Sequence, residues 1–246
     1  MKIINTIKLA AFLGLSLSVL GTSNSAFADF NIYSPYISKG KVKLQSRTEY
    51  SVDDDDKVDG SFEQYLEAGY GVTDHWYLEA GVALKDKPSK DLETDNLMLQ
   101  SKFELGEKGQ YFVDAGFKVV YKHNTTGDAD TLKAQLLLAK DIGKFKGLVN
   151  LDVEDEVGED SKDRQKFKAA MRAQYMHSPY FQPSIEYFAN FKDTTYDFEG
   201  QEHMAGPVVF GKITDSLKYE AGSLFGVSDK APDAVLKLNF VYKFKI

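Results

Sequence analysis

Apolar and polar residues alternate along most of the chain from residue 41 onward. The last stretch, residues 235–246, reads VLKLNFVYKFKI and shows the pattern most clearly. The apolar positions on one parity are Leu236, Leu238, Phe240, Tyr242, Phe244 and Ile246. The opposite parity carries Lys237, Asn239, Lys243 and Lys245, with Val241 as an apolar exception. A period of two predicts a β-strand with one apolar and one polar face.

The same alternation recurs along the chain and predicts about 12 strands of about 10 residues, the length that a tilted membrane-spanning strand needs. Short turns such as 73–74 alternate with longer charged loops, among them 53–60, 85–95 and 154–163. This asymmetry is typical of an up-and-down barrel with both termini on one side. Proline cannot donate to a ladder, so the pair Gly206-Pro207 predicts a bulge or a local break.

Alternation alone does not separate a membrane barrel from a soluble, lipocalin-like one, and two further features do. Aromatic residues of the apolar parity gather near strand ends, as Tyr111 and Tyr121 or Phe181 and Phe191 do, which is typical of the two aromatic girdles of an outer-membrane barrel. The opposite parity is charged throughout and offers little apolar filling for a soluble interior. The sequence therefore predicts an all-β protein, an antiparallel up-and-down transmembrane β-barrel.

The N-terminus has the features of an export signal. Lys2 and Lys8 precede an apolar run at 9–20, and Ala26-Phe27-Ala28 offers a small-x-small cleavage site. The run is shorter than the roughly 20 apolar residues of a spanning helix. We expect a signal peptide at 1–28 cleaved after Ala28, an extended periplasmic lead-in at 29–40, and an outer-membrane barrel at 41–246.

Charge and composition exclude several classes of function. Removing the signal peptide moves the net charge from −7 to about −9, which argues against nucleic-acid binding. The chain has no Cys, so disulfides, thiolate metal sites and a Cys nucleophile are excluded. No long apolar run follows the signal, so a helical membrane protein is excluded as well.

Few residues point to catalysis or to metal binding. His75, His123 and His177 fall in predicted turns and loops, and His203 stands beside Glu202 without a Ser in a nucleophile-elbow pattern. The acidic runs 53–56 and 154–160 lack EF-hand spacing, although a loop that binds a divalent cation remains an alternative to a solvated loop. We expect no enzyme, no catalytic residue, no metal site and no cofactor.

The polar face of the strands is the best candidate site. The residues expected to line the lumen are Lys41, Lys43, Arg47, Glu63, Glu67, Glu79, Asp114, Lys118, Lys168, Arg172, Glu186, Lys237 and Lys243. Twelve strands enclose more space than side chains alone fill, which favours a porin-like channel for passive diffusion of small polar or charged solutes. The alternative is a non-conducting structural or surface barrel, for adhesion or envelope integrity, in which these charges pair into a salt-bridged interior.

A closed barrel places the first and last strands side by side. Lys41, Lys43 and Arg47 would then lie beside Lys237 and Lys243, with no acidic residue on the closing strand to offset them. Like charges at this distance repel unless an anion occupies the space between them. This basic seam predicts modest anion selectivity that weakens when Arg47 and Lys237 are changed to Glu.

Three stretches carry a resemblance to known proteins. The segment YSPYISKG before the first strand and the stretch GYGVTDHWYLEAGV with its T-D-x-W turn resemble uncharacterised proteobacterial outer-membrane barrels, and more loosely the transporters of the phenol-degradation (MetA-pathway) type. The closing strand resembles the C-terminal signature of such barrels, with Phe244 as its last aromatic residue in place of an aromatic terminus. The resemblance implies a barrel and a small-solute channel, with outer-membrane lipids, lipopolysaccharide and the barrel assembly machinery as partners.

Overall fold

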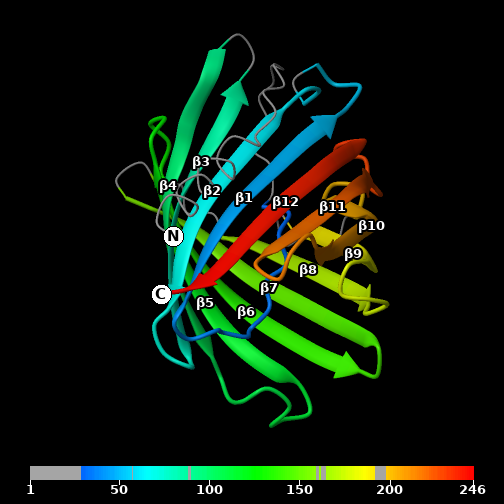
Figure 1. The fold of residues 1–246 in the computed structure, drawn as a ribbon. Helices are drawn as coiled ribbons and strands as arrows, with labels where there is room; N and C mark the ends of the chain where they lie inside the picture. Colours follow the sequence, from blue (N-terminus) through cyan, green and yellow to red (C-terminus); the bar gives the residue numbers. More distant parts are fainter. Residues whose placement is uncertain (1–28, 57, 88–89, 159–160, 162–164, 192–197) are drawn as a thin grey trace.

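The chain forms one closed β-barrel of twelve antiparallel strands in the computed structural model (Figure 1). The structure describes residues 29–246 except 57, 88–89, 159–160, 162–164 and 192–197. The strands are β1 Lys41–Val52, β2 Phe62–Gly71, β3 Trp76–Lys87, β4 Lys90–Glu104, β5 Asp114–Asn124, β6 Asp130–Ile142, β7 Phe145–Val157, β8 Lys166–Tyr175, β9 Gln182–Phe191, β10 Glu202–Lys212, β11 Leu217–Gly226 and β12 Ala234–Lys245. Within the described residues no helix is long and apolar enough to cross a membrane.

Each strand pairs with its neighbours in sequence, and β1 closes the barrel by pairing with β12. The two strands lie side by side in Figure 1, and their register runs from Lys41 opposite Lys245 to Val52 opposite Ala234. Closure leaves no sheet edge with unpaired backbone groups, which a bilayer requires of a spanning sheet. The predicted fold class and the pairing of the first and last strands are confirmed.

The apolar faces of the strands point outward and the charged faces point inward. Leu99 is 58% exposed and Ile185 is 66% exposed, whereas Glu186 is 0% exposed and Lys237 is 4% exposed. A soluble barrel of this size would bury the apolar face and expose the charged one. The inversion therefore identifies a barrel whose outer surface suits lipid.

Two local predictions need correction or refinement. The predicted loop 85–95 is largely a hairpin, since β3 continues to Lys87 and β4 begins at Lys90, with irregular register between Ala83 and Lys87. Gly206 and Pro207 stay paired with β9 while the ladder toward β11 is interrupted at both residues, and the register is the same on either side. The structure has a local break there and no bulge.

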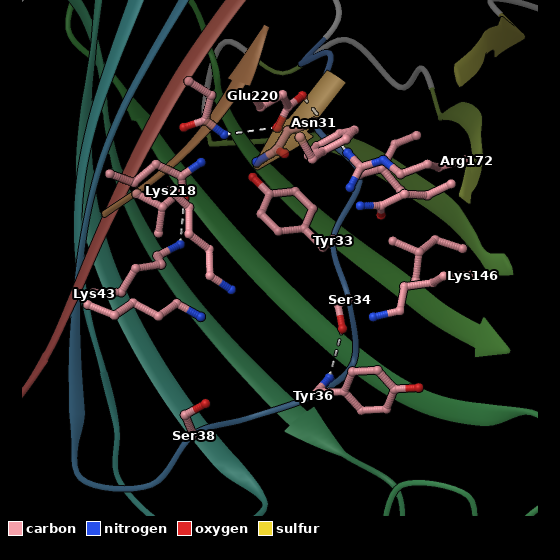
Figure 2. Close-up of a pocket in the computed structure, with 18 of the residues that line it drawn as sticks. Asn31, Tyr33, Ser34, Tyr36, Ser38, Lys43, Lys146, Arg172, Lys218 and Glu220 are labelled. Atoms are coloured by element: carbon pink, nitrogen blue, oxygen red, sulfur yellow. Dashed lines mark hydrogen bonds and ion pairs between the residues drawn. The ribbon is translucent and has the colours of Figure 1, made fainter. Parts of the chain in front are cut away.

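The N-terminal segment, residues 29–40, lies inside the barrel, whereas a periplasmic position was expected from the sequence. It runs through the interior and leads into β1 (Figures 1 and 2), which begins directly after Gly40. Gly40 has a φ of +70°, a left-handed conformation that glycine adopts without strain. Phe30 is 1% exposed and Ile32 is 4% exposed, so the segment is packed against the wall.

The segment divides the interior into two regions. We call the end of the barrel that holds Gly40 and Ile246 the turn end, and the opposite end the loop end. Phe30 packs edge-on against Phe188 of β9, with 5.2 Å between ring centroids, in an apolar cluster that extends from the cavity toward the loop end. The other members of this cluster are Ile32, Ala139, Leu148, Met204, Val208, Leu224 and Val235. The region toward the turn end is polar and holds the candidate site.

Candidate functional site in the barrel interior

A cavity of about 630 Å³ occupies the interior toward the turn end. Its lining includes Lys41, Lys212 and Lys243, which stand at or near the strand ends there, so the cavity reaches this end of the barrel. The volume lies in the range of small-molecule sites in proteins. The N-terminal segment is part of the site, since all its residues from Asn31 to Ser38 except Pro35 contribute to the lining.

Basic side chains dominate this cavity. Its lining holds nine Lys and Arg residues and two Glu residues. The basic residues are Lys41, Lys43, Lys102, Lys118, Lys146, Arg172, Lys212, Lys218 and Lys243, and the acidic ones are Glu79 and Glu220. This balance is the reverse of the whole chain, which has 37 acidic and 30 basic residues. The field in the cavity therefore favours anions.

Asn150 of β7 holds the middle of the N-terminal segment. Its Oδ1 accepts a hydrogen bond from the backbone N–H of Tyr33 at 2.7 Å, and its Nδ2 donates to the backbone carbonyl of Tyr33 at 2.9 Å. Asn150 is fully buried. The two bonds copy the pattern of an antiparallel ladder, so one wall side chain satisfies both backbone groups of a residue that belongs to no strand.

Lysines from two neighbouring strands also contact the segment. Lys102 of β4 donates to the carbonyl oxygens of Ser34 and Tyr36, each at 3.0 Å. Lys118 of β5 lies 3.0 Å from the centre of the Tyr33 ring and donates to Gln100 Oε1 at 3.0 Å. The nitrogen atoms of both side chains are therefore held by neutral partners.

Further contacts fix the segment where it leaves the barrel. Tyr36 donates from its hydroxyl to Asp114 at 2.7 Å, and the backbone N–H of Ile37 donates to Glu104 at 2.8 Å. At the exposed turn beyond the strands, Lys39 donates to Asp74 at 2.9 Å. That hydrogen bond lowers the pKa of the Asp74 carboxyl below its usual range.

Pro35 approaches the wall at a glycine. A Cβ placed on Gly116 of β5 would lie 2.8 Å from Pro35 Cβ and 3.0 Å from the carbonyl oxygen of Phe103. Real side chains avoid such distances, so only glycine lets the segment pass this close to β5.

A four-residue ion-pair network crosses the interior at the border of the cavity, which Arg172 and Glu220 line. Glu186 of β9 contacts Arg172 Nε of β8 and Lys237 Nζ of β12, each at 2.6 Å. Lys237 also lies 3.0 Å from Glu220 of β11, which is 3.9 Å from Arg172 Nη2. β9 and β12 are not neighbours in the sheet, so the pair between Glu186 and Lys237 spans the inside of the barrel.

A second network is centred on the N-terminal segment. Asp29 lies 2.8 Å from Arg47 Nη1 of β1 and 3.3 Å from Lys133 Nζ of β6. Arg47 also pairs with Glu49 at 2.6 Å, and its guanidinium lies 3.9 Å from the centre of the Tyr65 ring. Asp29 thus joins two strands on different sides of the barrel and ties the start of the segment to the wall.

These networks correct the prediction of an unpaired basic seam. Arg47 and Lys237 are ion-paired, and Lys43 lies 2.5 Å from Glu79 of β3. The closing strand has no acidic residue on its inner face, but carboxylates reach it from strands elsewhere in the barrel. The basic character predicted for the seam persists only toward the turn end, at Lys41 and Lys243.

The thirteen residues that the sequence singled out fall into distinct groups. Six line the cavity: Lys41, Lys43, Glu79, Lys118, Arg172 and Lys243. Four belong to the two ion-pair networks: Arg47, Arg172, Glu186 and Lys237. Arg172 is counted twice, because it also lines the cavity. Three more lie nearer the loop end. Glu63 pairs with Lys85, Glu67 accepts a hydrogen bond from Gln100, and Lys168 pairs with Glu154. Asp114 lies at the turn end, where it accepts a hydrogen bond from Tyr36.

Sequence reasoning missed Lys102, Lys218 and the N-terminal segment. Lys102 shares the parity of Gln100 and Glu104, and Lys218 that of Glu220, so the alternation could have placed both inside. The segment gives a signal through its content of large apolar residues, Phe30 and Ile32 among them, which a solvated linker would not need.

The histidines do not come together into a site. His75, His123 and His177 are exposed, and His203 is buried at the start of β10. His203 hydrogen-bonds the Tyr187 hydroxyl at 2.7 Å and stacks on Phe198 with 4.1 Å between centroids. The Ser228 hydroxyl beside it donates to the carbonyl oxygen of Gln201. In the described part of the chain, no group of three or more His, Cys, Asp or Glu residues is arranged to hold a metal ion.

Comparisons with known proteins place this fold among outer-membrane channels. No protein family and no curated protein matches the chain. Among solved structures, an outer membrane channel from Pseudomonas putida F1 is similar with a TM-score of 0.62 and 16% identity over 89% of this chain and 100% of that one. The NanC porin gives a TM-score of 0.61 and 10% identity over 82% and 100% of the two chains. The KdgM porin gives 0.56 and 9% over 82% and 99%. At these identities the likeness concerns the fold, which is that of the twelve-stranded porin-like outer-membrane barrel.

Proposed function

We propose that the protein is an outer-membrane channel for passive diffusion of small polar or charged solutes. The observation that carries this proposal is the water-accessible cavity inside a barrel whose outer face is apolar. An interior built only for stability would be filled, since empty space forfeits packing contacts. The fold shared with porins of known structure supports the same conclusion.

In this proposal the N-terminal segment controls passage. The segment and the apolar cluster around Phe30 fill the interior toward the loop end, whereas the cavity opens toward the turn end. The segment is held by a limited set of polar contacts, at Asp29, Tyr33, Tyr36 and Ile37. A solute would cross when these contacts open and the segment moves aside.

The orientation and setting follow from the same proposal. Outer-membrane barrels have short periplasmic turns and longer outer loops, so the turn end would face the periplasm. The signal peptide would be cleaved after Ala28, which leaves Asp29 as the first residue of the segment inside the barrel. Lipid and lipopolysaccharide would surround the apolar face, and the barrel assembly machinery would insert the chain.

Conductance in planar bilayers tests the proposal. The mature chain, residues 29–246, is refolded in detergent and compared with a chain that begins at residue 39. We expect discrete conductance steps from both, with a larger step and fewer closures for the shortened chain. Two correctly folded, heat-modifiable barrels that both fail to conduct would overturn the proposal.

The second candidate function is the non-conducting barrel with a paired interior. The network of Arg172, Glu186, Glu220 and Lys237 favours it, because four buried charges joined across the lumen resist displacement. The shortened chain separates the candidates. If the shortened chain does not conduct, the barrel is blocked by the ion-pair network and the other wall side chains and not by the N-terminal segment.

A further inference from the structure

The cavity has more positive charge than its own carboxylates offset. Lys43 pairs with Glu79, and Arg172 pairs with Glu186 beyond the cavity. Lys41, Lys218 and Lys243 have no carboxylate partner within 4.0 Å among the described residues, although all three line the cavity. Ammonium groups gathered in a partly enclosed space repel one another, and a bound anion relieves this repulsion.

The basic groups converge from opposite walls. In Figure 2, Lys43 and Lys218 reach inward from one side of the cavity, and Lys146 and Arg172 lie on the other side, with the Tyr33 ring between the two groups. Lys43 is on β1, Lys218 on β11, Lys146 on β7 and Arg172 on β8. A solute with two or three carboxylate or phosphate groups can place one group against each wall.

The lining also offers neutral and aromatic surface. Tyr33, Tyr77 and Phe210 stand among the basic groups, and Gln45 and Asn239 add amide donors. Phe210 itself lies under the Arg172 guanidinium, 4.0 Å from its ring centre. These groups contact the carbon skeleton and hydroxyl groups of a solute while the lysines hold its charged ends.

We propose that this cavity is a binding site for small organic or inorganic anions that carry two or more carboxylate or phosphate groups. The inference deepens the proposed channel function by naming the class of solute, and it holds for the cavity itself whether or not the barrel conducts. The solute enters at the turn end and binds beside the N-terminal segment. Lys102 and Lys118, which hold the segment, lie within reach of the same solute, so binding competes with the contacts of the segment.

Calorimetry on the refolded mature chain tests binding without any measurement of conductance. Citrate and pyrophosphate serve as probes of the two chemistries, with glucose as a neutral control and spermidine as a cationic one. We expect saturable binding of citrate, pyrophosphate or both at low ionic strength, weakened as salt rises, because screening reduces the attraction. No saturable binding of either anion, or equal binding of spermidine, would overturn the inference.

A matched pair of variants locates the site. Lys218→Gln with Lys243→Gln removes two unpaired cavity charges, whereas Lys144→Gln with Lys230→Gln removes two exposed charges outside the cavity. We expect at least tenfold weaker anion binding in the first variant, about 1.4 kcal/mol, and no change in the second. Equal weakening in both would mean that net charge and not the cavity binds the anion. Heat-modifiable mobility in SDS confirms that each variant is folded.

The same variants separate this inference from the channel proposal. Specific binding in a barrel that does not conduct would refute the channel and leave the anion site intact. Conductance that neither citrate nor pyrophosphate blocks, together with absent binding, would refute the anion site and leave the channel intact.

Discussion

Asn150 is the side chain whose removal should free the N-terminal segment. Asn150→Ala deletes the two hydrogen bonds to the backbone of Tyr33 and adds no bulk to the wall. Each bond contributes about 1 kcal/mol, and a buried group left without a partner costs about 1–3 kcal/mol, less where cavity water reaches it. We expect the displaced state of the segment to gain about 2–4 kcal/mol relative to the bound state. That is roughly a 30-fold to 700-fold rise in its population.

Cysteine labelling measures this population directly, because the chain has no cysteine of its own. Ile32→Cys places a thiol at a position that is buried against the wall. Position 32 is 4% exposed although it borders the cavity, so a maleimide reacts with this thiol mainly while the segment is displaced, and the labelling rate reports the opening equilibrium. We expect the labelling rate to rise roughly 30-fold to 700-fold when Asn150→Ala is added to the Ile32→Cys background.

The matched control is Asn239→Ala, which removes another buried asparagine, one that lines the cavity and does not contact the segment. Asn239 donates to Glu220 at 3.1 Å, a contact within the wall. Its loss should leave the labelling rate within about threefold of the background. A rate that does not rise with Asn150→Ala, or that rises equally with Asn239→Ala, would show that Asn150 does not anchor the segment.

Four further outcomes are expected. The mature barrel should resist SDS until boiled and then shift in mobility, whereas a urea-extractable chain without a heat shift would contradict a lipid-embedded barrel. Replacing Phe240, Tyr242 and Phe244 together by Ser should lower the outer-membrane level of the protein, as measured by fractionation, and normal insertion would show that the closing strand is not the assembly signal. Gly116→Leu should displace Pro35 and raise the labelling rate at position 32 by at least tenfold, because the new side chain would occupy the space that Pro35 fills. An unchanged rate would show that Pro35 does not pack closely against Gly116. Glu186→Gln should lower the free energy of unfolding in urea by about 3–5 kcal/mol, since Arg172 and Lys237 lose their shared partner. The control Glu156→Gln changes a partly exposed pair and should lower it by less than about 1 kcal/mol. Equal losses in the two variants would show that the network does not stabilise the barrel.

The sequence predicted the barrel well because a strand in a membrane barrel repeats one simple rule. The side-chain period is two, and lipid lies on one face of every strand, so each strand carries the same signal independently. The closing stretch 235–246 shows the rule and pairs as expected with β1. The loop 85–95 was misassigned because its charged residues look like a solvated loop, although β3 and β4 extend beyond the shared rim of the barrel with charged side chains.

The interior was less predictable because parity says which way a side chain points and not which side chain it meets. Lys237 and Glu186 lie on strands that are not neighbours, and their contact depends on the height of each residue along the barrel axis. That height follows from the register of every strand between them. The sequence therefore indicated the charged interior but predicted an unpaired seam at Arg47 and Lys237, where the structure has ion pairs.

The N-terminal segment gives the interior its asymmetry and decides how the basic residues can act. Its apolar residues, Phe30 and Ile32, find apolar partners on inward-facing positions that interrupt the charged parity, Met204 and Leu224 among them. Those exceptions make sense only with the segment present, because apolar side chains on the wall of a water-filled lumen would stay exposed to water without apolar contacts. The segment thus fills the barrel toward the loop end, and the lysines near the turn end face the cavity that remains. In the proposed channel the same segment would obstruct the lumen and line the basic cavity, so a variant that releases it should alter conductance and anion binding together.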